Sequence, residues 1–252
     1  ATAPVTLVPT ESVVERARVR KDAYELDVLR EAGRRLSHVA REVLGMTLRG
    51  RTELDVAADI DWHLRHAGFE RPAFETIVAG GSNSALPHAR PTERRCDEGD
   101  LVVLDFGGVF ASYCVDLTRT VSIGPASSRA RAVHRAVIEA RQQAIATVGP
   151  GVSRFDVDAA AREALGAAGM REAFGHGTGH GLGIEIHEAP RVVQRRPDVD
   201  DQDEPLEVGM VFTVEPGAYF PGWGGVRIED DLVVTHRGAE LLTDVTTDLI
   251  EL

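Results

Sequence analysis

An internal repeat is the feature of this sequence that most constrains its fold. Residues 52–56, with the sequence TELDV, recur about one hundred positions later as SRFDV at residues 153–157. In both copies a hydroxyl side chain precedes an acid by three residues, which is the pattern of a helix capping box. Apolar residues at helical spacing follow, and a glycine at position 68 or 169 closes the segment. The sequence therefore predicts two copies of one amphipathic helix.

Further elements are predicted on both sides of the repeated helix. A long helix precedes each copy, at residues 23–47 and at residues 128–148. Strands follow each copy, and the run GDLVVLDFG at residues 99–107 corresponds to GMVFTVEPG at residues 209–217. Helices and strands in two like blocks favour an α+β domain with pseudo-twofold symmetry.

The two halves of this domain are expected at residues 25–124 and residues 127–252. The offset between matching positions grows along the chain, which indicates an insertion in the second half. We expect this insertion in the polar stretch at residues 195–205.

The composition limits the partners of the chain. Lys and Arg number 28 against 40 Asp and Glu, which gives a net charge of −12. This charge argues against nucleic acid or an anionic membrane surface as the main partner. No apolar run approaches the roughly 20 residues that span a membrane. Two cysteines do not form a disulfide framework, so a cytoplasmic location is expected.

Four acids occupy matched positions in the two halves: Asp105 matches Glu215, and Asp116 matches Glu229. Asp105 and Glu215 each end an apolar run, where an ionised carboxylate is costly unless it is paired or bound to a metal. A twofold relation would bring all four acids together. Two divalent metal ions held by these carboxylates would neutralise their charge.

A glycine-rich segment at residues 175–183, GHGTGHGLG, suggests a fifth ligand. Glycines let the backbone approach an ion or a substrate closely. The segment lacks the G-x-G-x-x-G pattern of a dinucleotide-binding loop. His180, as a neutral imidazole, would fit one position at a metal, whereas His176 is expected to be structural.

Around these positions the sequence resembles the methionine aminopeptidase/prolidase family of pita-bread metallopeptidases, from Lys21 to Leu252. The motifs that carry the resemblance are LDFG, DLTRT, GHGLG, VEPG and RIED, in the order found in the family. The resemblance implies a catalytic domain at residues 21–252, with the pita-bread fold around a central curved antiparallel sheet. It also implies five metal ligands, which fall on Asp105, Asp116, His180, Glu215 and Glu229.

The resemblance further implies a dinuclear-metal exopeptidase. Oxygen-rich ligands favour hard ions, so Mn²⁺ is the first choice, with Co²⁺ or Zn²⁺ as alternatives. Glu215 is expected to take a proton from the attacking water and to pass it to the leaving nitrogen. His88 and His187 are expected to contact the substrate and the developing oxyanion.

Two features favour the prolidase and aminopeptidase P branch of the family. The runs EPGAY and GVRIED, which contain Tyr219 and Arg227, resemble that branch, and we expect both residues at the substrate site. Arg191 falls where prolidases can place an arginine that holds the terminal carboxylate of the substrate. The expected activity is therefore hydrolysis of the Xaa-Pro bond of dipeptides, small peptides with proline at the second position.

Three alternatives stay open. The chain could remove the first residue from longer peptides, as aminopeptidase P does, or act like a methionine aminopeptidase. It could also be a non-enzymatic binding module with the same fold. Prolidases normally carry an additional amino-terminal domain that helps them dimerise. We therefore expect residues 1–20 to be a linker from such a domain, and a homodimer as the assembly.

Overall fold

The structure, a computed structural model, describes residues 8–196 and 202–252. Its helices are α1 (Val13–Val19), α2 (Ala23–Val43), α3 (Glu53–His66), η1 (Gly81–Ala85), α4 (Ser128–Thr147), α5 (Arg154–Ala167) and η2 (Arg171–Ala173), where η denotes a 3-10 helix. Its strands are β1 (Arg71–Pro72), β2 (Ile77–Gly80), β3 (Leu101–Phe110), β4 (Tyr113–Ser122), β5 (Gly179–Gly181), β6 (Glu188–Val192), β7 (Val211–Val214), β8 (Gly217–Phe220), β9 (Gly224–Arg227), β10 (Asp230–Thr235) and β11 (Gly238–Leu241). Part of the predicted linker, residues 1–7, and part of the predicted insertion, residues 197–201, lie outside the described residues.

The predicted helices of both halves are present. The second long helix, α4, matches its prediction to within one residue, whereas α2 ends at Val43, four residues earlier than predicted. At the start of α3, Thr52 and Asp55 form the predicted capping box. At the start of α5 the Ser153 side chain accepts from the Phe155 N–H instead, so the predicted capping box is confirmed only in the first half.

The strands form one sheet in each half and a separate hairpin. In the first half, β4 pairs with one edge of β3, while β1 and β2 pair with the other edge. In the second half the strand order is β11-β10-β7-β5-β6, and β8 and β9 form the hairpin. All the pairings between these named strands are antiparallel.

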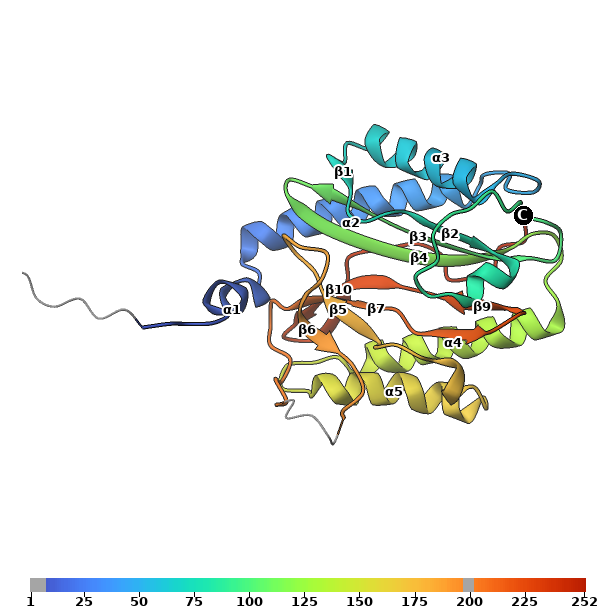
Figure 1. Ribbon diagram of the computed structural model, residues 1–252. Coiled ribbons are helices and arrows are strands. Elements are labelled where there is room, and N and C mark those ends of the chain that lie inside the picture. The colour runs from blue at the N-terminus through green and yellow to red at the C-terminus, as the bar shows by residue number, and fades with distance from the viewer. Residues whose placement is uncertain (1–7, 197–201) are drawn as a thin grey trace, which may run out of the picture.

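The helices lie on the two outer sides of these sheets (Figure 1). Helices α2 and α3 cover the first-half sheet, and α4 and α5 cover the second-half sheet on the opposite side. Each layer has its own apolar core: Leu36 and Ile60 are fully buried in the first, and Val137 and Leu165 are fully buried in the second. The two like halves therefore meet through their sheets, and the site described below lies between them.

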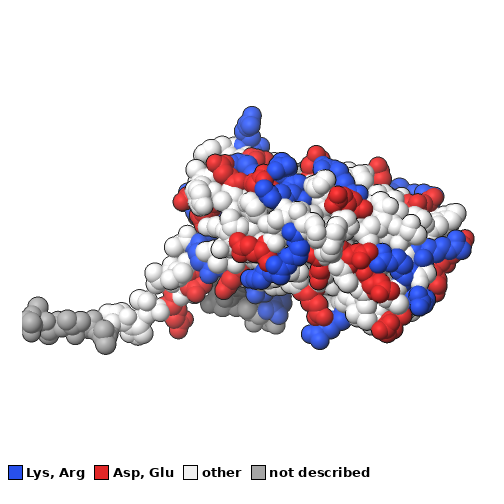
Figure 2. All heavy atoms as spheres, turned by 90° about the horizontal axis from the view of Figure 1, so that it is seen from above, with Lys and Arg blue, Asp and Glu red and all other residues white. Residues whose placement is uncertain are grey.

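The outer surface is charged and mixed in sign. Figure 2 shows Lys and Arg side chains interspersed with Asp and Glu side chains on the face seen from above. Over the described parts of the chain, no helix is both long enough and apolar enough to cross a membrane.

Candidate metal centre and active site

The first two acids project from one face of the β3–β4 hairpin. Asp105 lies opposite Thr118, and Asp116 lies opposite Gly107. Because side chains alternate between the two faces of a strand, residues two positions apart on paired strands share a face. Asp105 and Asp116 are diagonal neighbours in this register, so their carboxylates point to the same side.

The other two acids lie at the ends of strands in the second half. Glu215 directly follows β7, and Glu229 directly precedes β10. Val214 of β7 lies opposite Asp230 of β10, which brings the two glutamates to the same end of the pair.

His180 occupies the middle of β5, next to β7. Strand β5 comes this close to β7 because residue 179 is glycine: a Cβ there would lie 1.8 Å from the Thr213 carbonyl oxygen. The His180 N–H bonds to the Thr213 hydroxyl at 3.1 Å, and its Nδ1 lies 3.1 Å from the Gly181 carbonyl oxygen. A carbonyl at that distance requires a proton on Nδ1, which leaves the Nε2 lone pair free to bind a metal.

Hydrogen bonds between β4 and β10 join the two halves at the acids. The Glu229 N–H donates to the Thr118 carbonyl oxygen at 3.1 Å, and the Asp116 N–H donates to Oδ2 of Asp231 at 2.8 Å. The Thr118 hydroxyl also donates to the Glu229 carboxylate. These bonds set the distance between acids that lie more than one hundred residues apart in the sequence.

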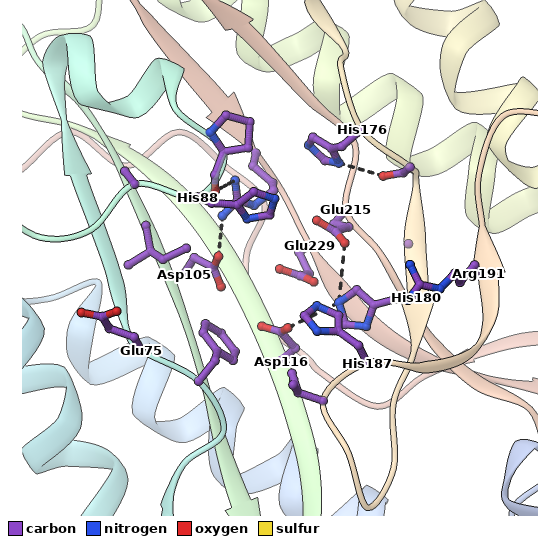
Figure 3. A pocket seen from close by; sticks show the side chains of 18 of the residues that line it. Glu75, His88, Asp105, Asp116, His176, His180, His187, Arg191, Glu215 and Glu229 are labelled. Atoms are coloured by element: carbon purple, nitrogen blue, oxygen red, sulfur yellow. Dashed lines mark hydrogen bonds and ion pairs between the residues drawn. The ribbon is translucent and has the colours of Figure 1, made fainter. Parts of the chain in front are cut away.

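The side chains converge in one cavity of about 440 Å³ (Figure 3). His180 Nε2 lies 3.6 Å from Oε1 of Glu215 and 3.8 Å from Oδ2 of Asp116. Ligand atoms of Asp116, His180 and Glu229 all lie within 4.8 Å of one another, as the ligands of one metal ion do. Asp105 faces the same cavity, and its Oδ2 accepts from Nη2 of Arg227.

The electrostatics of this cluster favour the uptake of cations. Burial raises the pKa of Asp116 and of Glu229 well above the usual range, and the neighbouring acids add to both shifts. Burial also raises the pKa of Glu215 to about 8, although Arg227 opposes that shift. In contrast, burial lowers the pKa of His180 to about 4, so its imidazole is neutral at pH 7.

A divalent metal fits the polar atoms that the protein leaves unsatisfied here. Oδ1 of Asp105 and Oδ1 of Asp116 are buried and have no hydrogen-bond partner among the described residues. Buried carboxylate oxygens are costly unless they are bonded or bound to a cation. The set of four acids and one neutral imidazole is a donor set that divalent first-row metals accept.

The residues predicted to contact substrate surround this cluster. His88, His187 and Arg191 all line the cavity, and the rings of His187 and His180 are 4.3 Å apart. Burial, with the nearby charge of Arg191, lowers the pKa of His187. A neutral His187 ring offers one N–H donor to the cavity.

Arg227 and Tyr219 belong to a buried network behind the acids. Arg227 Nη1 donates to the Tyr219 hydroxyl at 3.0 Å, and that hydroxyl lies 2.8 Å from Nε2 of His176. Arg227 and His176 line the cavity, whereas Tyr219 is not among its lining residues. His176, for which the sequence predicts a structural role, therefore also lines the cavity.

Sequence reasoning missed the residues that support the acids. Arg119 Nη1 donates to the carbonyl oxygens of Thr118 and Glu229 at 2.9 and 2.6 Å. Arg119 Nη2 also bonds to Oδ1 of Asp230 at 2.8 Å. The only sequence signal for these residues is their place inside the DLTRT and RIED motifs.

A family model for metallopeptidase family M24 matches residues 27–236, which is most of the chain. The chain belongs to metallopeptidase family M24. It is 36% identical over 240 residues to an Xaa-Pro dipeptidase of Pyrococcus furiosus, covering 95% of this chain and 67% of that protein. The family membership inferred from the five motifs is confirmed.

Solved structures of M24 relatives share the fold of this chain. An Xaa-Pro dipeptidase from Bacillus anthracis superposes with a TM-score of 0.92 at 39% identity, covering 97% of this chain and 67% of that one. An X-Pro aminopeptidase from Thermotoga maritima superposes with a TM-score of 0.91 at 37% identity, covering 96% and 67%. The predicted pita-bread fold is confirmed, and the chain spans about two thirds of the length of these relatives.

Because it belongs to family M24, this chain is a metallopeptidase. Membership of this family implies divalent metal ions and a peptide substrate. The structure adds a group of side chains suited to hold a metal. The number and identity of the ions, the peptide that is cleaved and the role of each residue belong to the proposal that follows.

Proposed function

We propose that this chain is a dinuclear-metal exopeptidase that hydrolyses Xaa-Pro dipeptides. The observation that carries the proposal is the convergence of Asp105, Asp116, His180, Glu215 and Glu229 in one cavity, with Arg191 at the same cavity. Relatives of this chain that are named Xaa-Pro dipeptidase support the choice of substrate.

The five converging residues would hold two divalent ions. When bound, such ions supply Lewis-acid chemistry, which polarises a scissile carbonyl and acidifies the attacking water. Mn²⁺ is the proposed ion because carboxylate oxygens dominate the donor set, and Co²⁺ or Zn²⁺ would be substitutes.

The remaining roles belong to residues of the chain itself. Glu215 accepts the proton of the attacking water and returns it to the leaving nitrogen. His187 donates its N–H to the developing oxyanion, and His88 contacts the substrate from the opposite wall of the cavity (Figure 3). Arg227 holds the carboxylate of Asp105 in place, and Tyr219 in turn holds Arg227.

Arg191 would select dipeptides by binding the terminal carboxylate of the substrate. No side chain among the described residues pairs with the guanidinium of Arg191, whose main-chain carbonyl accepts from Arg154. A guanidinium is well suited to bind a carboxylate through two parallel hydrogen bonds. A longer peptide would carry an amide where the dipeptide carries that carboxylate.

A panel of three peptides with Mn²⁺ present tests the proposal. We expect cleavage of Ala-Pro, and slower cleavage of Ala-Pro-Ala and Met-Ala-Ser. Cleavage of the tripeptides alone would refute the role of Arg191 and favour an aminopeptidase. No cleavage, together with no Mn²⁺ binding in a calorimeter, would favour a binding module.

Variants of two residues separate binding from chemistry. We expect Arg191→Gln to raise KM for Ala-Pro by at least tenfold with a smaller change in kcat, because it removes a contact to bound substrate. We expect Glu215→Gln to lower kcat by more than a hundredfold, because it removes the proton acceptor. Sedimentation of the wild-type protein tests the expectation that the chain forms a homodimer.

A further inference from the structure

The loop between β5 and β6 carries His187 and is fixed through its backbone. The loop spans residues 182–187. Among the described residues, no side chain hydrogen-bonds to the His187 ring, which packs against the His180 ring at 4.3 Å, so the direction of its N–H donor depends on the loop backbone. On one side the Gly183 carbonyl oxygen accepts from the Cys114 N–H at 2.6 Å. Cys114 lies on β4, two residues before Asp116, so this side of the loop is tied to the acid cluster.

The other side of the loop is tied to the carboxylate of Glu188. Glu188 is the residue after His187, and its side chain is only 7% exposed. Its Oε1 accepts from the Glu185 N–H at 2.9 Å, which closes the loop on itself. The same carboxylate pairs with Arg18 and with Lys21, whose Nζ lies 3.4 Å from Oε2.

Lys21 is the only lysine of the chain, and it is almost completely buried. Its side chain is 1% exposed, which is rare for lysine unless the charge is paired. The backbone around it is also anchored, because the Lys21 N–H donates to the Gly209 carbonyl oxygen at 2.8 Å. Gly209 directly precedes the Met210 that forms a bridge with Arg20 near the start of β7.

Gly183 shows how closely these groups pack. A Cβ at position 183 would lie 2.9 Å from Oε2 of Glu188 and 3.0 Å from Cε of Lys21. The lysine stem and the carboxylate therefore rest directly on the loop backbone. Residues 18–21 lie outside the stretch matched by the family model, which begins at residue 27.

We infer that Lys21, with Arg18, is a positioning residue that sets the place of His187 by clamping Glu188. The end of α1 and the segment between α1 and α2 thereby act on the cavity without contacting substrate. Loss of the ion pairs between Glu188 and these two cations frees the side of the loop that lies away from Cys114. The His187 donor then loses its fixed direction, while the four acids, which lie outside the loop, keep theirs. This role of His187 rests on the proposed function.

Amide hydrogen exchange on the metal-free protein tests the clamp without any substrate. We expect loop residues 183–187 to exchange at least tenfold faster in Lys21→Met and in Glu188→Gln than in the wild type. Arg94→Met is the matched control, because Arg94 forms a partly buried pair with Asp100 and does not line the cavity. We expect no change of exchange in the loop of that control. The Glu188→Gln variant keeps the side-chain shape, which keeps the test informative if Lys21→Met does not fold.

Kinetics on the Mn²⁺-loaded protein test the consequence for His187. A misplacement of about 1 Å can cost about a hundredfold in rate, so we expect kcat for Ala-Pro to fall 10- to 100-fold in both variants. We expect KM and the Mn²⁺ dissociation constant to change less than threefold. In a His187→Ala background, Lys21→Met should have no further effect on kcat, which a general structural defect would not reproduce.

The outcomes separate the clamp from the proposed function. If the wild type cleaves no peptide, the proposed function fails, and the exchange rates still decide whether the clamp exists. Unchanged exchange in both variants would overturn the clamp. Faster exchange with unchanged kcat, or an additive effect in the His187→Ala background, would overturn the positioning of His187.

Discussion

The buried carboxylate of Asp230, next to the proposed ligand Glu229, offers a direct test of how this fold is held together. The Asp230 carboxylate accepts three hydrogen bonds: from Nη2 of Arg119 at 2.8 Å, from Nε of Arg141 at 2.6 Å and from the Thr243 hydroxyl at 2.7 Å. Its side chain is 1% exposed. Through these bonds Asp230 joins β4, β10, α4 and the segment after β11.

The change Asp230→Ala leaves two buried guanidinium groups without their shared anion. Removing one partner of a buried ion pair costs about 3–5 kcal/mol, because the remaining charge stays buried and uncompensated. A domain is stable by only about 5–15 kcal/mol, so this loss is a large part of the total. We therefore expect the free energy of unfolding to fall by at least about 3 kcal/mol.

Urea unfolding of the metal-free protein, followed by circular dichroism, measures this loss. Asp244→Ala is the control, because Asp244 pairs with Arg41 at a fully exposed position, and we expect a change below about 0.5 kcal/mol. Adding Arg141→Met to Asp230→Ala should restore part of the stability, since it removes one of the unpaired charges and, among the described residues, Arg141 makes no other side-chain hydrogen bond. A loss below about 1 kcal/mol for Asp230→Ala would refute the reasoning that this carboxylate compensates buried charge.

Three further predictions concern pH, packing and metal. Burial lowers the pKa of His134 to about 4, so the wild type should lose about 2 kcal/mol of stability between pH 7.5 and 5 that His134→Leu does not lose. A buried neutral histidine contributes its full stability above its unfolded pKa, and this contribution falls as the pH drops. If the urea midpoint fell equally from pH 7.5 to pH 5 in the wild type and in His134→Leu, this prediction would be contradicted. Gly179→Ala places a Cβ against the Thr213 carbonyl oxygen, and we expect at least tenfold weaker Mn²⁺ binding in calorimetry, whereas Gly175→Ala, where the added Cβ meets no atom within 4 Å, should bind normally. Mn²⁺ at a hundred times its dissociation constant should stabilise the protein by about 2.7 kcal/mol for each ion bound, or about 5–11 °C in Tm per ion. Asp116→Asn should abolish most of that shift in a thermal melt, and an undiminished shift would place the metal elsewhere.

The proposed ligand positions stand out in the sequence because the free-energy cost of burying an acid can be recognised from its neighbours in the chain. An acid that directly follows a run such as LVVL must be paired or bound to a metal, and this is visible without any tertiary information. The capped helices are visible for the same reason, since a cap is a contact over three residues. Asp105 and Glu215 therefore stand out in the sequence, and the structure places both at one cavity.

The supporting residues could not be predicted because their partners are distant in the sequence. Thr118 and Glu229 are 111 residues apart, and Lys21 and Glu188 are 167 residues apart. Neither the lone lysine nor a threonine inside a strand differs locally from a surface residue. Their burial follows from how β4 meets β10 and from how the chain enters α2, which are tertiary facts.

The same reasoning explains why the duplicated acids are not equivalent. A twofold repeat alone would treat Asp105 and Glu215 alike, but Arg227 lies on the Asp105 side and pairs with its carboxylate. No guanidinium among the described residues forms an ion pair with Asp116 or Glu229. Burial raises the pKa of both acids, and the neighbouring carboxylates add to the shift, which the charge of Arg227 opposes at Glu229. The uncompensated negative charge is therefore concentrated where Asp116 and Glu229 meet His180. A cation is stabilised most at that place. His180, which has no counterpart in the first half, and Arg227, which of the described acids pairs with Asp105 only, therefore break the symmetry that the repeat imposes.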